Sequence, residues 1–240
     1  MNISLRKINA IFILKLQLFL GNLSLLMIPA MAIGYVVIFK NFFPANTVAF
    51  KALTLNMGIL LNIIMGGIMF GAYPIAEEKE HHTLGVLMTS SINATEYFIG
   101  SLLPALLILT ITNIILVPLN GTSWNQMSII NYLIITVICS IISILIGFTL
   151  GLFSKNQTNA GVVSLLPAAI FTLVPLFKGF SNKISHTSDF LYSGVIPRFV
   201  NQSLFKHSYS WSLFEVSVLI AWFIIFSIVL FYAYRYKHFD

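Results

Sequence analysis

Long apolar runs separated by short polar stretches dominate the chain. Each run has about 18 to 25 residues, the length an α-helix needs to cross a hydrocarbon layer about 30 Å thick. Inside that layer the backbone must satisfy its own hydrogen bonds, so each run is predicted to be helical. The pattern predicts an all-α membrane protein with a single domain, residues 1–240, and six membrane-spanning helices, at 21–39, 53–75, 97–119, 129–153, 160–177 and 213–234.

Two further segments have mixed polarity. Residues 3–20 combine basic side chains, Lys15 among them, with apolar ones at helical spacing, which is typical of an amphipathic helix in the membrane interface. Residues 178–211 carry short apolar groups divided by Gly194 and Pro197. This pattern favours short helices, either in a re-entrant segment or at the surface, between the fifth and sixth spans rather than an open loop.

Charged side chains are scarce, and their distribution predicts an orientation. Only 8% of the residues are charged, and the net charge of +6 comes from single Lys and Arg residues at the ends of apolar runs, a pattern that does not indicate nucleic-acid binding. Seven Lys and Arg lie on the face with both termini and six on the other face, and four of those six belong to the long segment 178–211, so that the count without this segment is seven against two. We therefore expect a multi-pass protein of the cell membrane with both termini in the cytoplasm.

Four consecutive charged residues, Glu77, Glu78, Lys79 and Glu80, follow the second apolar run. Burying four charges in hydrocarbon would cost about 10 kcal/mol or more. We expect this stretch to lie in water, in a cytoplasmic connection between the second and third spans.

A short apolar stripe comes next, at Leu84, Leu87 and Met88. A helix of this length is not stable alone, so the stripe needs a covering partner, such as a groove in a soluble protein. Asn93 and Glu96 then have the spacing of a capping box, which predicts the start of the third span.

Two pairs of glycines have the four-residue spacing that lets helices approach closely. They are Gly67 and Gly71 in the second span, and Gly147 and Gly151 in the fourth. The spacing predicts helix packing, and both packing within one chain and packing between two copies remain open.

Candidate catalytic and metal-binding residues are few. His81 and His82 lack a further ligand at helical spacing, so we expect them to be solvated rather than to bind a metal. Glu215 could bind a cationic substrate or, as an interfacial acid, reach water. The sequence contains no G-x-x-x-x-G-K-[ST] motif and no plausible Ser, His and Asp combination, so we expect neither ATP hydrolysis nor another enzymatic activity.

The segment from Glu78 to Ser90 reads EKEHHTLGVLMTS, and Glu96 and Gly100 follow it. It resembles the ABC type-2 exporter permease family, in which a Glu-Lys/Arg-Glu, a Thr-Leu, a leucine pair and a Thr/Ala-Ser motif connect the second and third spans. The layout of an interfacial helix, six spans and a membrane-dipping segment is also similar. His82 stands where the family usually has Gly before the Thr, and Gly85 stands where Glu is common.

The resemblance implies a partnership. Two permeases, either two copies or two paralogues, pair in the membrane, and each sits on a separate cytoplasmic ATPase subunit that binds ATP and Mg. This chain itself then binds no cofactor. The coupling residues that the resemblance places between the second and third spans are Glu77, Glu78, Glu80, Thr83, Leu84, Leu87 and Met88.

The cargo is inferred from the near absence of charge in the spans and from three aromatic residues, Phe190, Phe199 and Phe205, that we expect at an outer gate. Such a pathway suits a hydrophobic or amphipathic cargo. Small permeases of similar composition resemble exporters of amphipathic peptides, among them phenol-soluble modulin exporters and lantibiotic immunity transporters. Export of drugs or lipids, and a non-transport role as a scaffold or channel, remain alternatives.

Overall fold

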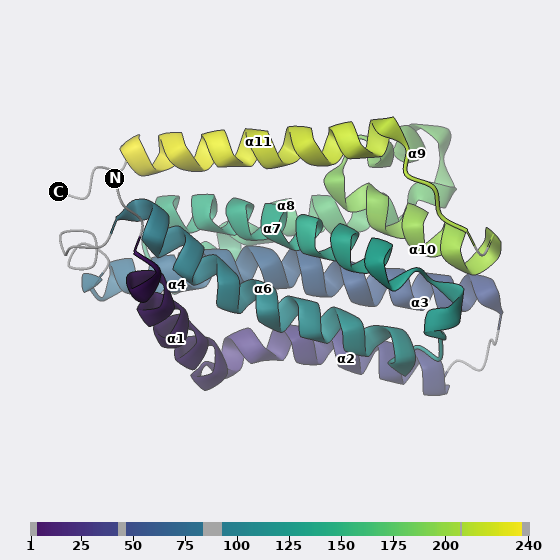
Figure 1. Ribbon diagram of the computed structural model, residues 1–240, viewed down its shortest axis with the longest axis horizontal. Coiled ribbons are helices and arrows are strands. Elements are labelled where there is room, and N and C mark those ends of the chain that lie inside the picture. Colours follow the sequence, from purple (N-terminus) through teal and green to yellow (C-terminus); the bar gives the residue numbers. More distant parts are fainter. Residues whose placement is uncertain (1–3, 43–46, 84–92, 207, 237–240) are drawn as a thin grey trace.

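A computed structural model describes residues 4–42, 47–83, 93–206 and 208–236, and these residues form helices with no strand among them (Figure 1). Six helical segments are long and apolar enough to cross a membrane. The prediction of an all-α protein with six candidate membrane spans is confirmed. The segments are α2 (Leu23–Phe42), a continuous helix formed by α3 (Val48–Leu60), the π-helix η1 (Leu61–Gly66) and α4 (Gly67–Glu80), then α6 (Ala94–Leu119), α7 (Ile129–Phe153), α8 (Gln157–Leu176) and α11 (Leu213–Tyr236).

The second segment differs most from its predicted bounds. It begins at Val48 instead of 53 and continues through Glu80 instead of ending at 75. The four charged residues are therefore the last turn of α4 and not a loop in water. The helix can continue because Glu78 and Lys79 have partners within the protein.

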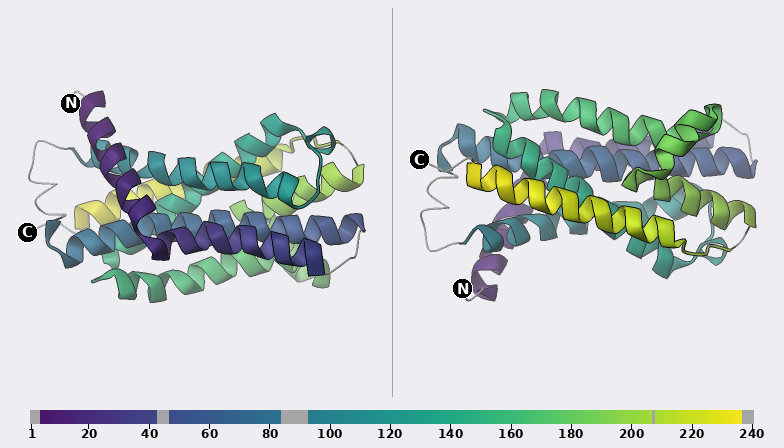
Figure 2. Two further views of the ribbon diagram at one scale, coloured as in Figure 1. Left: turned by 90° about the horizontal axis from the view of Figure 1, so that it is seen from below. Right: turned by 90° about the horizontal axis from the view of Figure 1, so that it is seen from above.

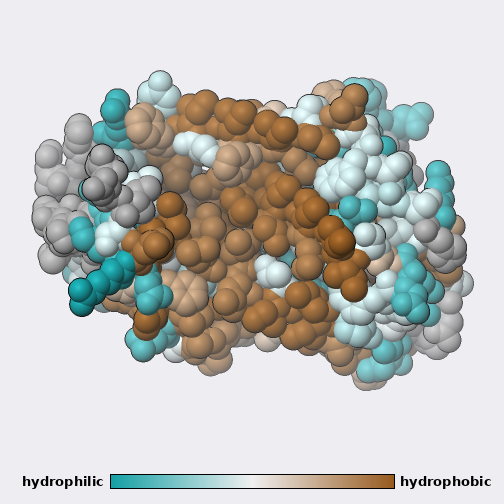
Figure 3. All heavy atoms as spheres, viewed as in Figure 1, coloured by the Kyte–Doolittle hydropathy of each residue, from teal (hydrophilic) through white to brown (hydrophobic). Residues whose placement is uncertain are grey.

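The surface has the polarity of a membrane protein. In Figure 3 the middle of the bundle is apolar and both ends are polar. The start of α1, the end of α4 and the end of α11 lie at one end, on the left of Figure 1. This arrangement agrees with the prediction that both termini and the end of the second span share a face.

The shorter helices occupy the two ends of the bundle. α1 (Leu5–Gly21) crosses the bundle obliquely and packs on α6 (Figure 2). At the opposite end, two short helices and three single 3-10 turns join the long helices. They are η2 (Trp124–Gln126), η3 (Lys178–Phe180), α9 (Asn182–Asp189), η4 (Tyr192–Gly194) and α10 (Val195–Lys206).

α4 and α7 are in backbone contact through the predicted glycines. A Cβ atom added to Gly71 would lie 2.9 Å from Gly147 Cα, and one added to Gly147 would lie 2.2 Å from the Ile68 carbonyl oxygen. A Cβ on Gly67 or Gly151 would be similarly crowded. In this structure the glycines therefore pack helices within one chain.

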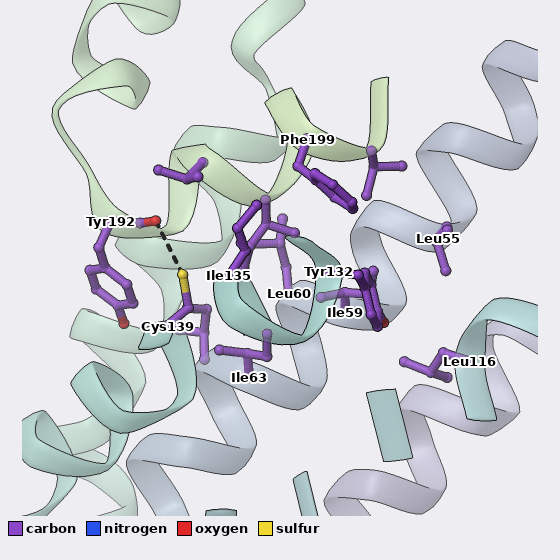
Figure 4. Packing of buried hydrophobic residues seen from close by; sticks show 14 of the residues in the cluster. Leu55, Ile59, Leu60, Ile63, Leu116, Tyr132, Ile135, Cys139, Tyr192 and Phe199 are labelled. Atoms are coloured by element: carbon purple, nitrogen blue, oxygen red, sulfur yellow. Dashed lines mark hydrogen bonds between the residues drawn. The ribbon is translucent and has the colours of Figure 1, made fainter. Parts of the chain in front are cut away.

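The largest apolar cluster among the described residues joins α3, α7 and α10 (Figure 4). Tyr132 and Phe199 are fully buried there, and the Cys139 thiol donates to the Tyr192 carbonyl oxygen at 3.5 Å. This packing holds α10 against the long helices.

Candidate functional site

The last turn of α4 sends three consecutive charged side chains to different neighbours. Successive residues of an α-helix point about 100° apart, so adjacent side chains can reach different helices. Glu78 points into the protein, Lys79 reaches the end of α7, and Glu80 reaches the start of α8. We call these three residues and their contacts the α4 junction.

Glu78 is the buried member of the α4 junction, with 7% of its surface exposed. Lys15 of α1, itself 1% exposed, donates from Nζ to Glu78 Oε1 at 2.5 Å, and the Tyr97 hydroxyl of α6 donates to the other carboxylate oxygen. Burial lowers the pKa of the Lys15 ammonium, and the neighbouring Glu78 carboxylate opposes this shift. Burying two charges is tolerable only because each has a charged or hydrogen-bonding partner.

Lys79 and Glu80 bind the ends of two other helices. Lys79 Nζ donates to the Leu152 carbonyl oxygen at 2.7 Å and also to that of Ser154, groups that the end of α7 leaves without helical partners. Glu80 Oε2 accepts from the backbone N–H of Gln157, at the start of α8, at 3.2 Å. Both charges complement the helix dipoles they face.

Glu96, at the start of α6, binds the ends of two helices. Its Oε2 accepts from the Asn93 backbone N–H at 3.0 Å, so the predicted capping box is confirmed. Its Oε1 accepts from the Ser4 backbone N–H at the start of α1, at 2.7 Å, and Lys7 lies 3.9 Å away. The second contact, which the sequence pattern did not predict, fixes α1 to α6.

The predicted coupling residues differ in how exposed the structure leaves them. The expectation that Glu78 lies in water is wrong, because Lys15 and Tyr97 enclose it. Glu80 and Thr83 are exposed, and Glu77 is partly buried. Leu84, Leu87 and Met88 lie outside the described residues.

Lys15 is the residue of the α4 junction that sequence reasoning missed. It was expected on the polar face of an interfacial helix, yet it is buried together with Ile8, Ile11 and Phe19. The spacing of the sequence indicates this burial. Lys15 comes four residues after Ile11 and four residues before Phe19, so the three side chains share one helix face. A lysine within an apolar stripe indicates a buried acidic partner.

The three phenylalanines of the expected outer gate do not meet. Phe199 is buried and packs against Tyr132 and Tyr209, whereas Phe190 and Phe205 are about half exposed. Phe199 and Phe205 are six residues apart on α10, which places them on different helix faces. The role of these three residues at an outer gate remains a prediction.

Glu215 is buried and paired within the protein, so the expectation that it reaches water is wrong. It is 3% exposed and forms an ion pair with Arg198 at 3.0 Å. Its Oε2 accepts from the Tyr209 hydroxyl at 3.2 Å and from the Ser212 backbone N–H at 3.0 Å. Burial, with the nearby Glu215 carboxylate, raises the pKa of the Tyr209 hydroxyl. These contacts join α10 to the first turn of α11.

His81 and His82 are exposed, and within the described ranges no three His, Cys, Asp or Glu side chains form a group that could hold a metal. His82 follows the C-cap of α4 with φ of +56°. This is the left-handed conformation that glycine adopts without strain at helix ends.

Replacing His82 by glycine is expected to raise the free energy of unfolding by about 1 kcal/mol, because the left-handed conformation costs other residues about that much. Thermal unfolding of the detergent-solubilised protein, followed by the reaction of buried Cys139 with a maleimide dye, measures the change. His81→Gly is the matched control, since His81 has φ of −90°. Equal shifts in the two variants would contradict the prediction.

The α4 junction is a mechanical connection: α1, α6, α7 and α8 are all attached to the last turn of one helix. A force on the segment that follows Glu80 would act on all of them.

No known protein family profile matches the chain, and no curated protein matches it.

Proposed function

We propose that this protein is the membrane subunit of an ATP-driven exporter of the ABC type-2 kind, and that it moves amphipathic or hydrophobic peptides out of the cell. Six candidate membrane spans and an apolar belt support a place in the membrane. The EKEHHTL motif at residues 78–84 supports the family.

The observation that carries the proposal is the α4 junction. Glu78, Lys79 and Glu80 connect the end of one candidate span to α1, α6, α7 and α8 through hydrogen bonds and an ion pair. A transporter driven by a separate ATPase needs such a connection, because movement at one contact must change the arrangement of several spans. In this proposal Glu78 transmits the movement from inside the protein instead of touching the ATPase.

The backbone conformation of His82 gives separate support to the resemblance between this motif and that of the family. The family usually has glycine at this position, and the left-handed φ of +56° is the conformation that glycine favours. The same backbone turn therefore accounts for the glycine of the family pattern and for the strain at His82.

The proposal also covers the location of the protein, its pairing and its partner subunit. The protein resides in the cell membrane with both termini in the cytoplasm, and it pairs with a second copy or a paralogue. A cytoplasmic ATPase subunit covers the apolar stripe of residues 84–88 and meets the acids Glu77 and Glu80 at its rim. ATP and Mg are bound by that subunit, and this chain is not an enzyme.

Replacing Leu87 by aspartate is expected to reduce co-purification of the ATPase subunit about tenfold or more, because a charge would enter the centre of an apolar contact. The ATPase is sought as a Walker-type protein encoded in a neighbouring reading frame and expressed together with tagged permease. The measurement is the ratio of the two proteins after solubilisation and affinity capture.

Leu5→Asp provides the matched control, because Leu5 is 80% exposed in the first turn of α1, where an acid is tolerated. Both variants must reach the membrane in wild-type amounts. Undiminished capture of the ATPase by Leu87→Asp would disprove the contact, and the lack of any associated ATPase would disprove the exporter.

A further inference from the structure

A cavity of about 470 Å³ lies at the end of the bundle opposite the α4 junction. α3 and α10 form its walls, and the end of α8, η3 and α9 line the rest of it. Its volume lies within the roughly 300 to 1,000 Å³ that is usual for small-ligand sites. The lining is mainly apolar, with Ala52, Leu53 and Phe205 among its members.

Two asparagines supply polar groups to this cavity. Asn56 of α3 is only 6% exposed, and its Nδ2 donates to Asn201 Oδ1 of α10 at 3.4 Å. The Asn56 Oδ1 atom is buried, with no hydrogen-bond partner among the described residues. A buried carbonyl oxygen without a donor costs about 1 to 3 kcal/mol, so a ligand that supplies an N–H or O–H group would be favoured.

The asparagine pair has a defined hydrogen-bonding pattern. Each carboxamide carries one acceptor oxygen and one NH₂ donor, and the bond between Asn56 and Asn201 uses the donor of one and the oxygen of the other. One oxygen and one NH₂ group remain. Rotating both amides by 180° exchanges the two residues' roles and leaves the same pair of groups.

An acceptor beside a donor is the complement of a secondary amide, which offers N–H and C=O together. We propose that this cavity binds the main-chain amide of an apolar peptide segment, with the amide on the asparagine pair and its side chains against the apolar walls. Lys178 lines the cavity, but its ammonium is already paired with Asp189. The expected ligand is therefore uncharged at this point.

This site deepens the proposed function, on which its physiological meaning rests, by naming the part of a peptide cargo that is recognised. The main chain is common to all peptides, so recognition would tolerate varied apolar sequences. Glycerolipids and many hydrophobic drugs lack a secondary amide flanked by two apolar groups. Binding itself needs no ATPase subunit, so it is measured on the isolated chain.

The test compares two probes on the full-length chain in lipid nanodiscs. One probe is N-(3-methylbutyl)-4-methylpentanamide, which has a single secondary amide between two leucine-like chains, and the other is the matching ester, 3-methylbutyl 4-methylpentanoate, which has no N–H group. Isothermal titration calorimetry is expected to show about tenfold tighter binding of the amide, because the ester leaves the buried oxygen unpaired. Asn56→Leu is expected to weaken amide binding about tenfold and to abolish the preference.

Asn125→Leu is the matched control, an exposed asparagine of η2 at the same end of the bundle but outside the cavity lining. It should retain the amide preference. Asn56→Ala, which removes the same buried oxygen with a smaller side chain, repeats the test if Asn56→Leu fails to fold.

Equal affinity for amide and ester, an unchanged preference in the folded asparagine variant, or no saturable amide binding would each overturn the site. These results are separable from a failure of the exporter proposal. An amide preference without any associated ATPase would refute the exporter alone, and a captured ATPase without the preference would refute the site alone.

Discussion

Replacing Lys15 by methionine is expected to lower the free energy of unfolding by about 3 to 5 kcal/mol, the usual cost of leaving one member of a buried ion pair without its partner. Among the described residues, the side chain of Glu78 would keep only the hydroxyl of Tyr97 as a donor. Its carboxylate would remain buried where water cannot replace the lost ammonium. Methionine fills much of the space of the lysine side chain, so the loss of stability would come mainly from the missing positive charge.

The measurement is a denaturant titration in detergent micelles, followed by the reaction of the single cysteine, Cys139, which is buried in the folded protein. The double variant Lys15→Met with Glu78→Gln should recover most of the loss, because no buried charge remains and Gln can still accept from Tyr97. Arg6→Met, on the exposed face of α1, should change stability by no more than about 0.5 kcal/mol. Additive effects of the two single substitutions would show that the ion pair is not coupled.

Gly147→Ala should lower the free energy of unfolding by about 3 kcal/mol, the upper part of the usual range for overpacking. The added methyl carbon would lie 2.2 Å from the Ile68 carbonyl oxygen, and backbone atoms cannot rotate out of its way. α4 and α7 would have to separate, which would disturb the glycine contact between these two helices.

Gly34→Ala is the matched control, because a Cβ there meets no atom within 4 Å. Gly34 lies inside α2, where alanine favours the helix by up to about 1 kcal/mol, so this variant should be slightly more stable. The same titration measures both variants. A loss of stability in both would indicate a general effect of the substitution and contradict the role of the close contact.

The fold was largely predictable because membrane spans have a strong local signal. Length and hydropathy identified all six candidate spans, and the predicted bounds 129–153 coincide with α7. The predicted second span ends at 75, five residues before Glu80, because a run of charges in a sequence indicates contact with water. Hydropathy averages cannot show that a carboxylate has a buried partner on another helix, as Glu78 has in Lys15.

The candidate site was predictable only in part. The capping box at Asn93 and Glu96 is local and was identified from spacing alone. The contacts of the α4 junction and of the asparagine pair are long-range: Lys15 and Glu78 are 63 residues apart, and Asn56 and Asn201 are 145 apart. No periodicity in a single sequence connects such positions.

The buried ion pair also sets an order for biosynthesis. Lys15 is synthesised 63 residues before Glu78, and at about 5 to 20 residues per second this interval is roughly 3 to 13 s. During it, burying the ammonium alone in the membrane would cost about 2.5 to 3.5 kcal/mol. We therefore expect the newly made α1 to remain at the water-exposed surface until the second span has been inserted, and to dock after α6 has emerged with Tyr97 and Glu96. The first helix to be translated would be among the last to reach its final place.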